Sequence, residues 1–260
     1  MSITYGSYLK LDQILSAQVP RSEGPEHDEM LFIIIHQVYE LWFKQVLCEF
    51  DFLQDRFVNS DTARVLHTLR RVLTILKTMV AQIDILETMT PQEFLSFRDR
   101  LESASGFQSF QFRELEFLLG LKRRSMLTHY PEDSEVRRRL KRRYRQPTLW
   151  DSFLHYLTGH GHDVPEALLT RDVTQPLDPS PEVQQILIKI YRKHPILSRV
   201  CERLVDFDEG FQEWRYRHVK MVERTIGTKH GTGGSAGVQY LQTTLFKPLF
   251  PDLWAIRTEL

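Results

Sequence analysis

The run FIIIHQVYELWF, from Phe32 to Phe43, contains a single histidine among aliphatic and aromatic residues. Around it, apolar residues recur at intervals of three and four from His27 to Phe57, and no proline interrupts the pattern. This period is that of an amphipathic helix. The sequence therefore predicts a long helix that carries His36 on an otherwise apolar face.

The same period recurs along most of the chain. Thr90-Pro91 and Ser60-Asp61 supply caps for two further helices. There is no alternating strand pattern of convincing length and no internal repeat. We expect an all-α fold, a single domain of long antiparallel helices that spans residues 1–260. The expected helices cover residues 61–86, 91–101, 107–121, 132–144, 149–157, 181–193, 196–225 and 238–246, with a connector at 160–181 and a loop at 227–237.

Composition narrows the class of protein. Lysine plus arginine and aspartate plus glutamate number 34 each, so the net charge gives no reason to expect a nucleic-acid partner. Cys48 and Cys201 lie in helical patterns without a nearby partner, which indicates a reducing compartment and a cytoplasmic location. The N-terminus lacks a signal-peptide pattern, and the longest apolar run, Met30–Ile35, is too short to span a membrane.

Two histidines are candidates for chemistry. His36 is either a core histidine bonded to a backbone carbonyl or a polar group in an apolar ligand pocket. His218, in the string WRYRH, is either structural or an axial ligand of haem iron, which requires a neutral imidazole. On separate helices, the two could face each other across a flat cofactor.

A third candidate site combines Arg98 with a glycine-rich loop. Arg98 follows Phe94 by four residues, so both project from one helical face. A guanidinium beside an aromatic ring suits the carboxylate of an amino acid; the alternative is a surface arginine paired with Asp99 or Glu102. The loop at 227–237 holds five glycines in eleven residues without a phosphate-binding motif, which indicates a lid over a substrate.

The remaining clusters favour no further site. No Glu-x-x-His motif occurs, so the ligand set of a di-iron helical bundle is missing. We interpret His160 and His162, in a predicted loop, as solvated. The basic run at 137–145 is interpreted as a solvated helix face, because neither net charge nor motif supports an anionic partner.

Several short strings, in chain order and over nearly the whole length, resemble tryptophan 2,3-dioxygenase. No single string is specific, but their order is. They are TYGSYL at 4–9, HDEMLFII at 27–34, HQ at 36–37, ELW at 40–42, FR at 97–98, SGFQS at 105–109, WRYRH at 214–218 and GTGGS at 231–235.

The resemblance implies a haem enzyme that inserts O₂ across the indole C2–C3 bond of L-tryptophan. The product would be N-formylkynurenine, in the first step of tryptophan catabolism by the kynurenine route. His218 would be the proximal ligand of a b-type haem, ferrous in the active state, and Ser105 would lie near the haem edge. His36 would be the distal catalytic histidine, close to the indole N–H.

The resemblance also implies the substrate contacts. Arg98 would bind the carboxylate with Phe94 beside it, and Phe32 would wall the indole pocket. Thr232 would contact the ammonium and carboxylate end as the loop closes. Phe94 stands where some bacterial relatives carry tyrosine, so one hydroxyl contact is missing and weaker substrate binding is expected.

The implied assembly is a homotetramer. Its N-terminal segment, residues 1–26, would enter the neighbouring subunit, where Tyr5 and Tyr8 would complete the pocket; the leader before Tyr5 is expected to be nearly absent. Three other functions stay open: a related haem enzyme that adds one oxygen atom, a haem sensor without turnover, and a helical scaffold without cofactor.

Overall fold

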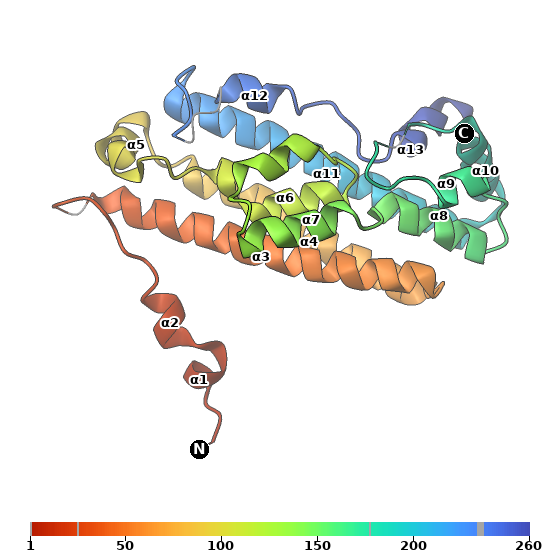
Figure 1. Cartoon of the computed structure of the whole chain (residues 1–260), viewed down its shortest axis with the longest axis horizontal. Coiled ribbons are helices and arrows are strands. Elements are labelled where there is room, and N and C mark those ends of the chain that lie inside the picture. The colour runs from red at the N-terminus through yellow and green to blue at the C-terminus, as the bar shows by residue number, and fades with distance from the viewer. Residues whose placement is uncertain (1, 25, 177, 233–236) are drawn as a thin grey trace.

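The computed structural model describes residues 2–24, 26–176, 178–232 and 237–260. Within these ranges the protein contains helices and no strand. Three long helices run along the molecule, and α4 packs against both of the others (Figure 1). They are α3 (His27–Val58), α4 (Thr62–Leu86) and α11 (Pro195–Ile226). The all-α fold expected from the sequence is confirmed.

Shorter helices surround these three. The α-helices are α1 (Tyr5–Leu9), α2 (Leu11–Leu15), α5 (Pro91–Arg98), α6 (Phe110–Leu118), α7 (Glu135–Tyr144), α8 (Leu149–Gly159), α9 (Glu166–Leu169), α10 (Pro181–Lys193), α12 (Val238–Gln242) and α13 (Pro251–Ala255). The 3-10 turns are η1 (Asp99–Leu101), η2 (Gly106–Gln108), η3 (Arg124–His129) and η4 (Ile256–Glu259).

The core is a continuous cluster of aliphatic and aromatic side chains contributed mainly by α3, α4, α8, α10 and α11. Phe50, Leu69 and Leu204, from the three long helices, have no exposed surface. Burial of such side chains is the main favourable term in folding. Local signals set the ends of the helices: α4 begins where the Asp61 side chain accepts a hydrogen bond from the Arg64 N–H.

Some helix boundaries differ from the predicted ones for local reasons. The helix expected at 91–101 is α5 followed by the tighter turn η1. The helix expected at 107–121 is shorter, because Ser109 accepts a hydrogen bond from the Phe112 N–H and begins α6 there. Helices α1, α2, α9 and α13 were not predicted; each has five residues or fewer, too few to show a clear period.

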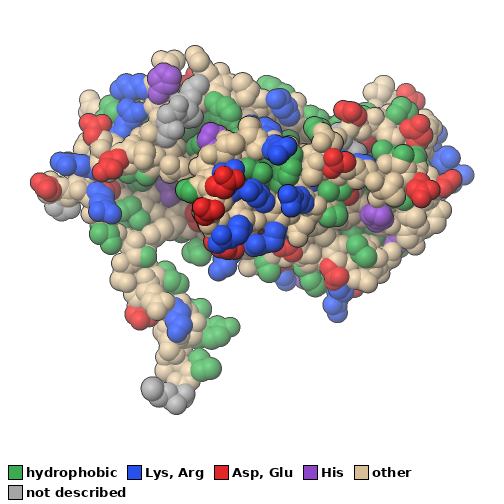
Figure 2. All heavy atoms as spheres, viewed as in Figure 1, with side chains coloured by type: hydrophobic (Ala, Val, Ile, Leu, Met, Phe, Trp, Pro, Cys, Tyr) green, Lys and Arg blue, Asp and Glu red, His purple; other side chains and the backbone are tan. Residues whose placement is uncertain are grey.

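The basic run is not simply a solvated face, which corrects the prediction. Arg139 Nε and Arg143 Nε lie 2.8 Å and 3.8 Å from carboxylate oxygens of Glu114, a buried residue of α6. Arg143 also donates two hydrogen bonds to Asp51 of α3. Basic and acidic side chains gather near the middle of the face in Figure 2. These pairs hold α7 against α6 and α3, and leaving Glu114 unpaired would be costly.

The pair His160 and His162 was also expected to be solvated, and both are half-buried. His160 Nδ1 lies 2.9 Å from the carbonyl oxygen of Tyr156 and so closes the end of α8. The His162 ring packs edge-on against His194, with 5.2 Å between centroids. Sequence alone could not show the contact between His162 and His194, because it joins residues that are distant in the chain.

The segment before α3 projects away from the body of the molecule (Figure 1). The end of this segment next to α3 is anchored by Glu29 of α3. The Glu29 carboxylate accepts hydrogen bonds from the backbone N–H groups of Arg21 and Ser22. By length and composition alone, α3 could cross a membrane. It instead packs against α4, α6 and α8 and carries the buried carboxylates of Glu29 and Glu49, as a helix within a folded domain does.

Candidate active site

A cavity of about 300 Å³ opens between α3, α4, α5, α6 and α11. Segments at residues 104–109, 231–232 and 237–244 complete its wall. The wall is mainly apolar with a few polar groups, which is typical of small-molecule sites. Seven residues singled out in the sequence line it together: Phe32, His36, Phe94, Arg98, Ser105, His218 and Thr232.

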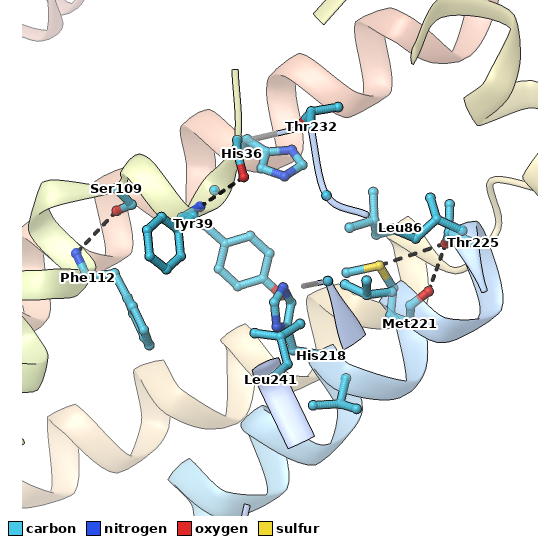
Figure 3. Close-up of a pocket in the computed structure, with 18 of the residues that line it drawn as sticks. His36, Tyr39, Leu86, Ser109, Phe112, His218, Met221, Thr225, Thr232 and Leu241 are labelled. Atoms are coloured by element: carbon cyan, nitrogen blue, oxygen red, sulfur yellow. Dashed lines mark hydrogen bonds between the residues drawn. The ribbon is translucent and has the colours of Figure 1, made fainter. Parts of the chain in front are cut away.

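His218 projects from α11 into this cavity (Figure 3). Its ring lies parallel to that of Trp214, one turn earlier, with 5.4 Å between centroids and 4° between planes. Neither ring nitrogen has a hydrogen-bond partner among the residues that the structure describes. Burial lowers the pKa of His218 to about 4, with a smaller contribution from His36. The imidazole is therefore uncharged at neutral pH, and a nitrogen lone pair is available to a metal ion.

His36 enters the same cavity from α3 (Figure 3). Its Nδ1 lies 2.7 Å from the carbonyl oxygen of Phe32. A carbonyl oxygen only accepts, so Nδ1 carries the hydrogen and Nε2 carries the lone pair. Burial lowers the pKa of His36, against the opposing effects of that hydrogen bond and of Glu40. Both interpretations of His36 therefore hold: one nitrogen is satisfied by the backbone, and the other is an acceptor.

Phenylalanine rings form the wall beside His36. The Phe32 centroid lies 4.1 Å from the His36 ring, 5.7 Å from Phe94 and 5.5 Å from Phe97. Phe94 and Phe97 meet edge-to-face at 83°. Aromatic pairs at these separations hold one another in fixed orientations, so the wall suits a flat aromatic ligand.

Two hydrogen bonds hold the described part of the glycine loop beside the cavity. Arg98 Nη2 donates to the carbonyl oxygen of His230 at 2.7 Å, and Thr232 Oγ1 donates to the carbonyl oxygen of Ala104 at 2.6 Å. Arg98 is not paired with its acidic neighbours in the described chain, so the surface ion pair considered above does not form. The loop and α5 thus bring Arg98 and Thr232 to one cavity.

The loop closes onto α12 at a glycine. Gly237 has a φ of +57°, and a Cβ there would lie 2.7 Å from the carbonyl oxygen of Lys229. Only glycine accepts both the left-handed backbone and this close approach. Gly233, Gly234 and Ser235, which belong to the predicted lid, lie outside the described residues.

Three predicted site residues lie at the edge of the cavity or outside it. Ser105 lies at the edge of the cavity, where its Oγ accepts a hydrogen bond from the Phe107 N–H at 3.3 Å. Tyr5 and Tyr8, on α1, are 77% and 74% exposed and do not line the cavity of their own chain. Their role in a neighbouring subunit stays a prediction.

Charged residues that were not singled out also line the cavity. They are Glu40 on α3, Arg113 and Glu116 on α6, and Arg215 on α11. Arg215 lies inside the string WRYRH, which was the only signal for it in the sequence. Nothing in the period of α6 predicted that three of its charged side chains, Arg113, Glu114 and Glu116, are buried.

The residues present fit a haem. A haem brings four nitrogen ligands of its own, and the protein adds an axial ligand, of which a neutral imidazole is a common one. His218 offers such an imidazole without a competing hydrogen bond, and His36 faces the same space. In the described ranges, no group of three or more His, Cys, Asp or Glu residues could hold a bare metal ion.

Comparison with known proteins agrees with this geometry. The family model for tryptophan 2,3-dioxygenase matches residues 1–185 and 181–260. The chain belongs to the tryptophan 2,3-dioxygenase family. It is 61% identical over 259 residues to the tryptophan 2,3-dioxygenase of Herpetosiphon aurantiacus, covering 100% of this chain and 99% of that one. The enzyme of Anaeromyxobacter dehalogenans is 57% identical over 256 residues, covering 98% and 96%.

The relationship extends to more distant bacteria. The tryptophan 2,3-dioxygenase of Myxococcus xanthus is 46% identical over 261 residues, covering 99% of this chain and 89% of that one. The tryptophan 2,3-dioxygenase family consists of haem-dependent dioxygenases. The resemblance drawn from the short strings is therefore confirmed at the level of the family.

Proposed function

We propose that this chain is a haem-dependent dioxygenase that converts L-tryptophan and O₂ to N-formylkynurenine. The observation that carries the proposal is the pair of uncharged histidines, His36 and His218, which enter one apolar cavity from α3 and α11. The names of the relatives support the substrate and the reaction. The aromatic wall and Arg98 support an aromatic amino acid as the ligand.

His218 would hold haem b through a ring nitrogen. The bound haem supplies the oxygen activation, a chemistry that side chains alone do not perform. Trp214, stacked on the His218 ring, keeps the plane of the imidazole in one orientation. The apolar wall would exclude water from the reacting groups, and Ser105, at the edge of the cavity, would lie near the haem edge.

His36 would orient the indole. Its Nε2 is the acceptor, because Nδ1 donates to the Phe32 carbonyl, so the indole N–H can donate to it. An indole N–H is a very weak acid, and a hydrogen bond at this atom needs no proton transfer. Arg98 would bind the carboxylate, and Thr232 the same end of the substrate. Fixing both ends holds the C2–C3 bond in position, which is an orientation effect.

Replacement of His36 by alanine should slow turnover about tenfold without abolishing it, because one orienting hydrogen bond is lost. The measurement is kcat per bound haem. His27→Ala is the matched control, since His27 lies on the same helix with a side chain 97% exposed. Complete loss of activity with haem still bound would show that His36 is an obligatory base; an unchanged kcat would remove it from the mechanism.

Phe94→Tyr should lower the Michaelis constant for tryptophan by up to about tenfold, because a phenolic hydroxyl beside Arg98 can donate to the carboxylate. Phe94 is buried against Phe32 and Phe97 and lines the cavity, so the cavity is the space open to the added hydroxyl. Steady-state kinetics with L-tryptophan and with tryptamine, which lacks the carboxylate, separate a contact with the carboxylate from a general effect on substrate binding. A gain with both substrates, or with neither, would contradict the hydroxyl contact.

The proposal includes a homotetramer in the cytoplasm with exchanged N-terminal segments. Several apolar side chains lie exposed along the projecting segment (Figure 2). Ile3, Tyr5, Tyr8 and Leu15 are 80%, 77%, 74% and 73% exposed. Contiguous exposed apolar surface of this kind is typical of an interface. Tyr5 and Tyr8 would contact the substrate of the neighbouring subunit. The unpaired thiols of Cys48 and Cys201 agree with a reducing compartment.

The function itself is tested by aerobic incubation of reduced, haem-loaded protein with L-tryptophan, followed by product mass and absorbance. A product heavier by two oxygen atoms, with the absorbance of N-formylkynurenine, is expected. A product heavier by one oxygen atom would mean a monooxygenase on this scaffold. No product despite bound haem would favour a sensor.

A further inference from the structure

A groove outside the catalytic cavity lies between the N-terminal halves of α4 and α11, two helices that pack against each other (Figure 1). Its volume is about 330 Å³, and the residues that line it are Leu66, His67 and Arg70 of α4 and Arg199 and Arg203 of α11. Along each helix the groove is about 15–20 Å from the first residue that lines the catalytic cavity, Ile83 on α4 and Trp214 on α11. The groove is therefore separate from the catalytic cavity.

The groove carries unmatched positive charge, and no acidic residue of the described chain lines it. Arg203 pairs with Asp206 at 2.8 Å, one turn further along α11. The guanidinium groups of Arg70 and Arg199 have neither an ion pair nor a hydrogen bond within the described ranges. Arg199 and Arg203 are also four residues apart on one helix, where like charges repel and destabilise the helix. Two guanidinium charges in this groove therefore lack a counter-charge.

Nearby carboxylates are engaged elsewhere. Glu202, which lies between the two arginines in the sequence of α11, accepts hydrogen bonds from Tyr191 and Arg257. Helix α4 contains four lysine or arginine residues and one acidic residue, Asp84, which pairs with Arg217 at 2.5 Å. The chain's own acids thus leave this part of α4 and α11 positively charged, although the net charge of the whole protein is zero.

His67 adds a further hydrogen-bond donor to the groove. Its Nε2 lies 3.2 Å from Nη2 of Arg71, whose charge is matched by Glu49 at 3.0 Å. A guanidinium only donates, so His67 Nε2 accepts this hydrogen bond and Nδ1 carries the hydrogen. The polar side chains that line the groove therefore offer donors alone, three guanidinium groups and one imidazole N–H. Such a set suits a ligand whose atoms only accept.

We propose that this groove binds a phosphate group, either as a free phosphate or pyrophosphate ion or as part of a small phosphorylated molecule. Phosphate oxygens accept paired hydrogen bonds from guanidinium groups, and a phosphate dianion supplies the two negative charges that the groove lacks. A carboxylate supplies one charge and two oxygens, too few for three guanidinium groups. The inference goes beyond the proposed function and does not depend on it, because no residue of the groove lines the catalytic cavity.

The test is titration calorimetry of the intact protein with sodium pyrophosphate at fixed ionic strength, where one site per chain is expected. Arg70→Gln and Arg199→Gln should each weaken the affinity about tenfold, because charge-assisted hydrogen bonds are lost. Both side chains are exposed and without partners in the described structure, so both variants should fold. Arg64→Gln is the matched control on α4: its side chain is 63% exposed and outside the groove, and its affinity should be native. Sodium acetate should give no saturable binding.

Titrations with inorganic phosphate and with adenosine diphosphate distinguish the sources: binding of the nucleotide more tightly than pyrophosphate supports a phosphorylated metabolite, and the reverse order supports the free ion. Absence of saturable pyrophosphate binding by the native protein would overturn the proposal. So would native affinity in both groove variants, or an equal loss in Arg64→Gln, which would show a response to overall charge alone. Sedimentation velocity tests the competing occupant, an acidic surface of a second copy: dissociation of the assembly in the groove variants alone would make the groove a subunit contact and overturn the phosphate site.

Discussion

His218→Ala is expected to give a folded protein that retains no haem and has no dioxygenase activity. The side chain is the cavity's only histidine on α11, and its uncharged nitrogen is the proposed axial ligand. Loss of that ligand removes the bond that holds the iron, and the apolar wall cannot replace it. The measurement is haem content per chain from the absorbance of the purified protein, together with product formation.

The structure also explains why this variant should fold. His218 forms no hydrogen bond with the described residues, so truncation leaves no buried partner unsatisfied. Helical circular dichroism should therefore be unchanged. His155→Ala, on the exposed face of α8, is the control for a histidine change on a helix. Added imidazole should restore part of the haem binding, because it can occupy the space left by the side chain. Full haem content and activity in His218→Ala would contradict the assignment.

The sequence predicted the helices that carry this site more completely than it predicted the charged side chains in the cavity wall. The period of three and four residues located α3, α4 and α11 to within a few residues, because each buries one face along many turns. The short sequence strings that resemble the family then identified candidate site residues on these helices and on α5. All seven residues predicted within the chain's own cavity do line it.

What the sequence could not show are features that depend on packing between distant segments. The pairs of Glu114 with Arg139 and of Glu116 with Arg215 join separate helices, α6 with α7 and α6 with α11, and charged residues are exposed by default. A charge pattern therefore predicted solvation where the structure has buried ion pairs. The Phe32 carbonyl that sets the tautomer of His36 is likewise visible only once the side chains are positioned.

Arg98→Leu is expected to raise the Michaelis constant for L-tryptophan by about tenfold to a hundredfold, with a smaller effect on kcat. A hydrogen bond to a charged group contributes about 1.5–3 kcal/mol, and each 1.4 kcal/mol corresponds to about tenfold in affinity. Leucine keeps an apolar side chain in the cavity wall but cannot bind a carboxylate. Arg100→Leu, at an exposed position on η1, is the matched control for loss of one positive charge.

In this structure the Arg98 guanidinium is already engaged, because it donates to the carbonyl oxygen of His230 in the glycine loop. A bound carboxylate must share or replace that bond, so Arg98→Leu removes two contacts at once. Loss of the loop contact would weaken every substrate, whereas loss of the carboxylate contact would weaken only amino acids. Comparison of L-tryptophan with tryptamine separates them: a raised Michaelis constant for L-tryptophan alone supports the carboxylate clamp. An equal increase for both would make Arg98 a loop anchor, and the acceptor of the carboxylate would then have to be sought elsewhere in the cavity.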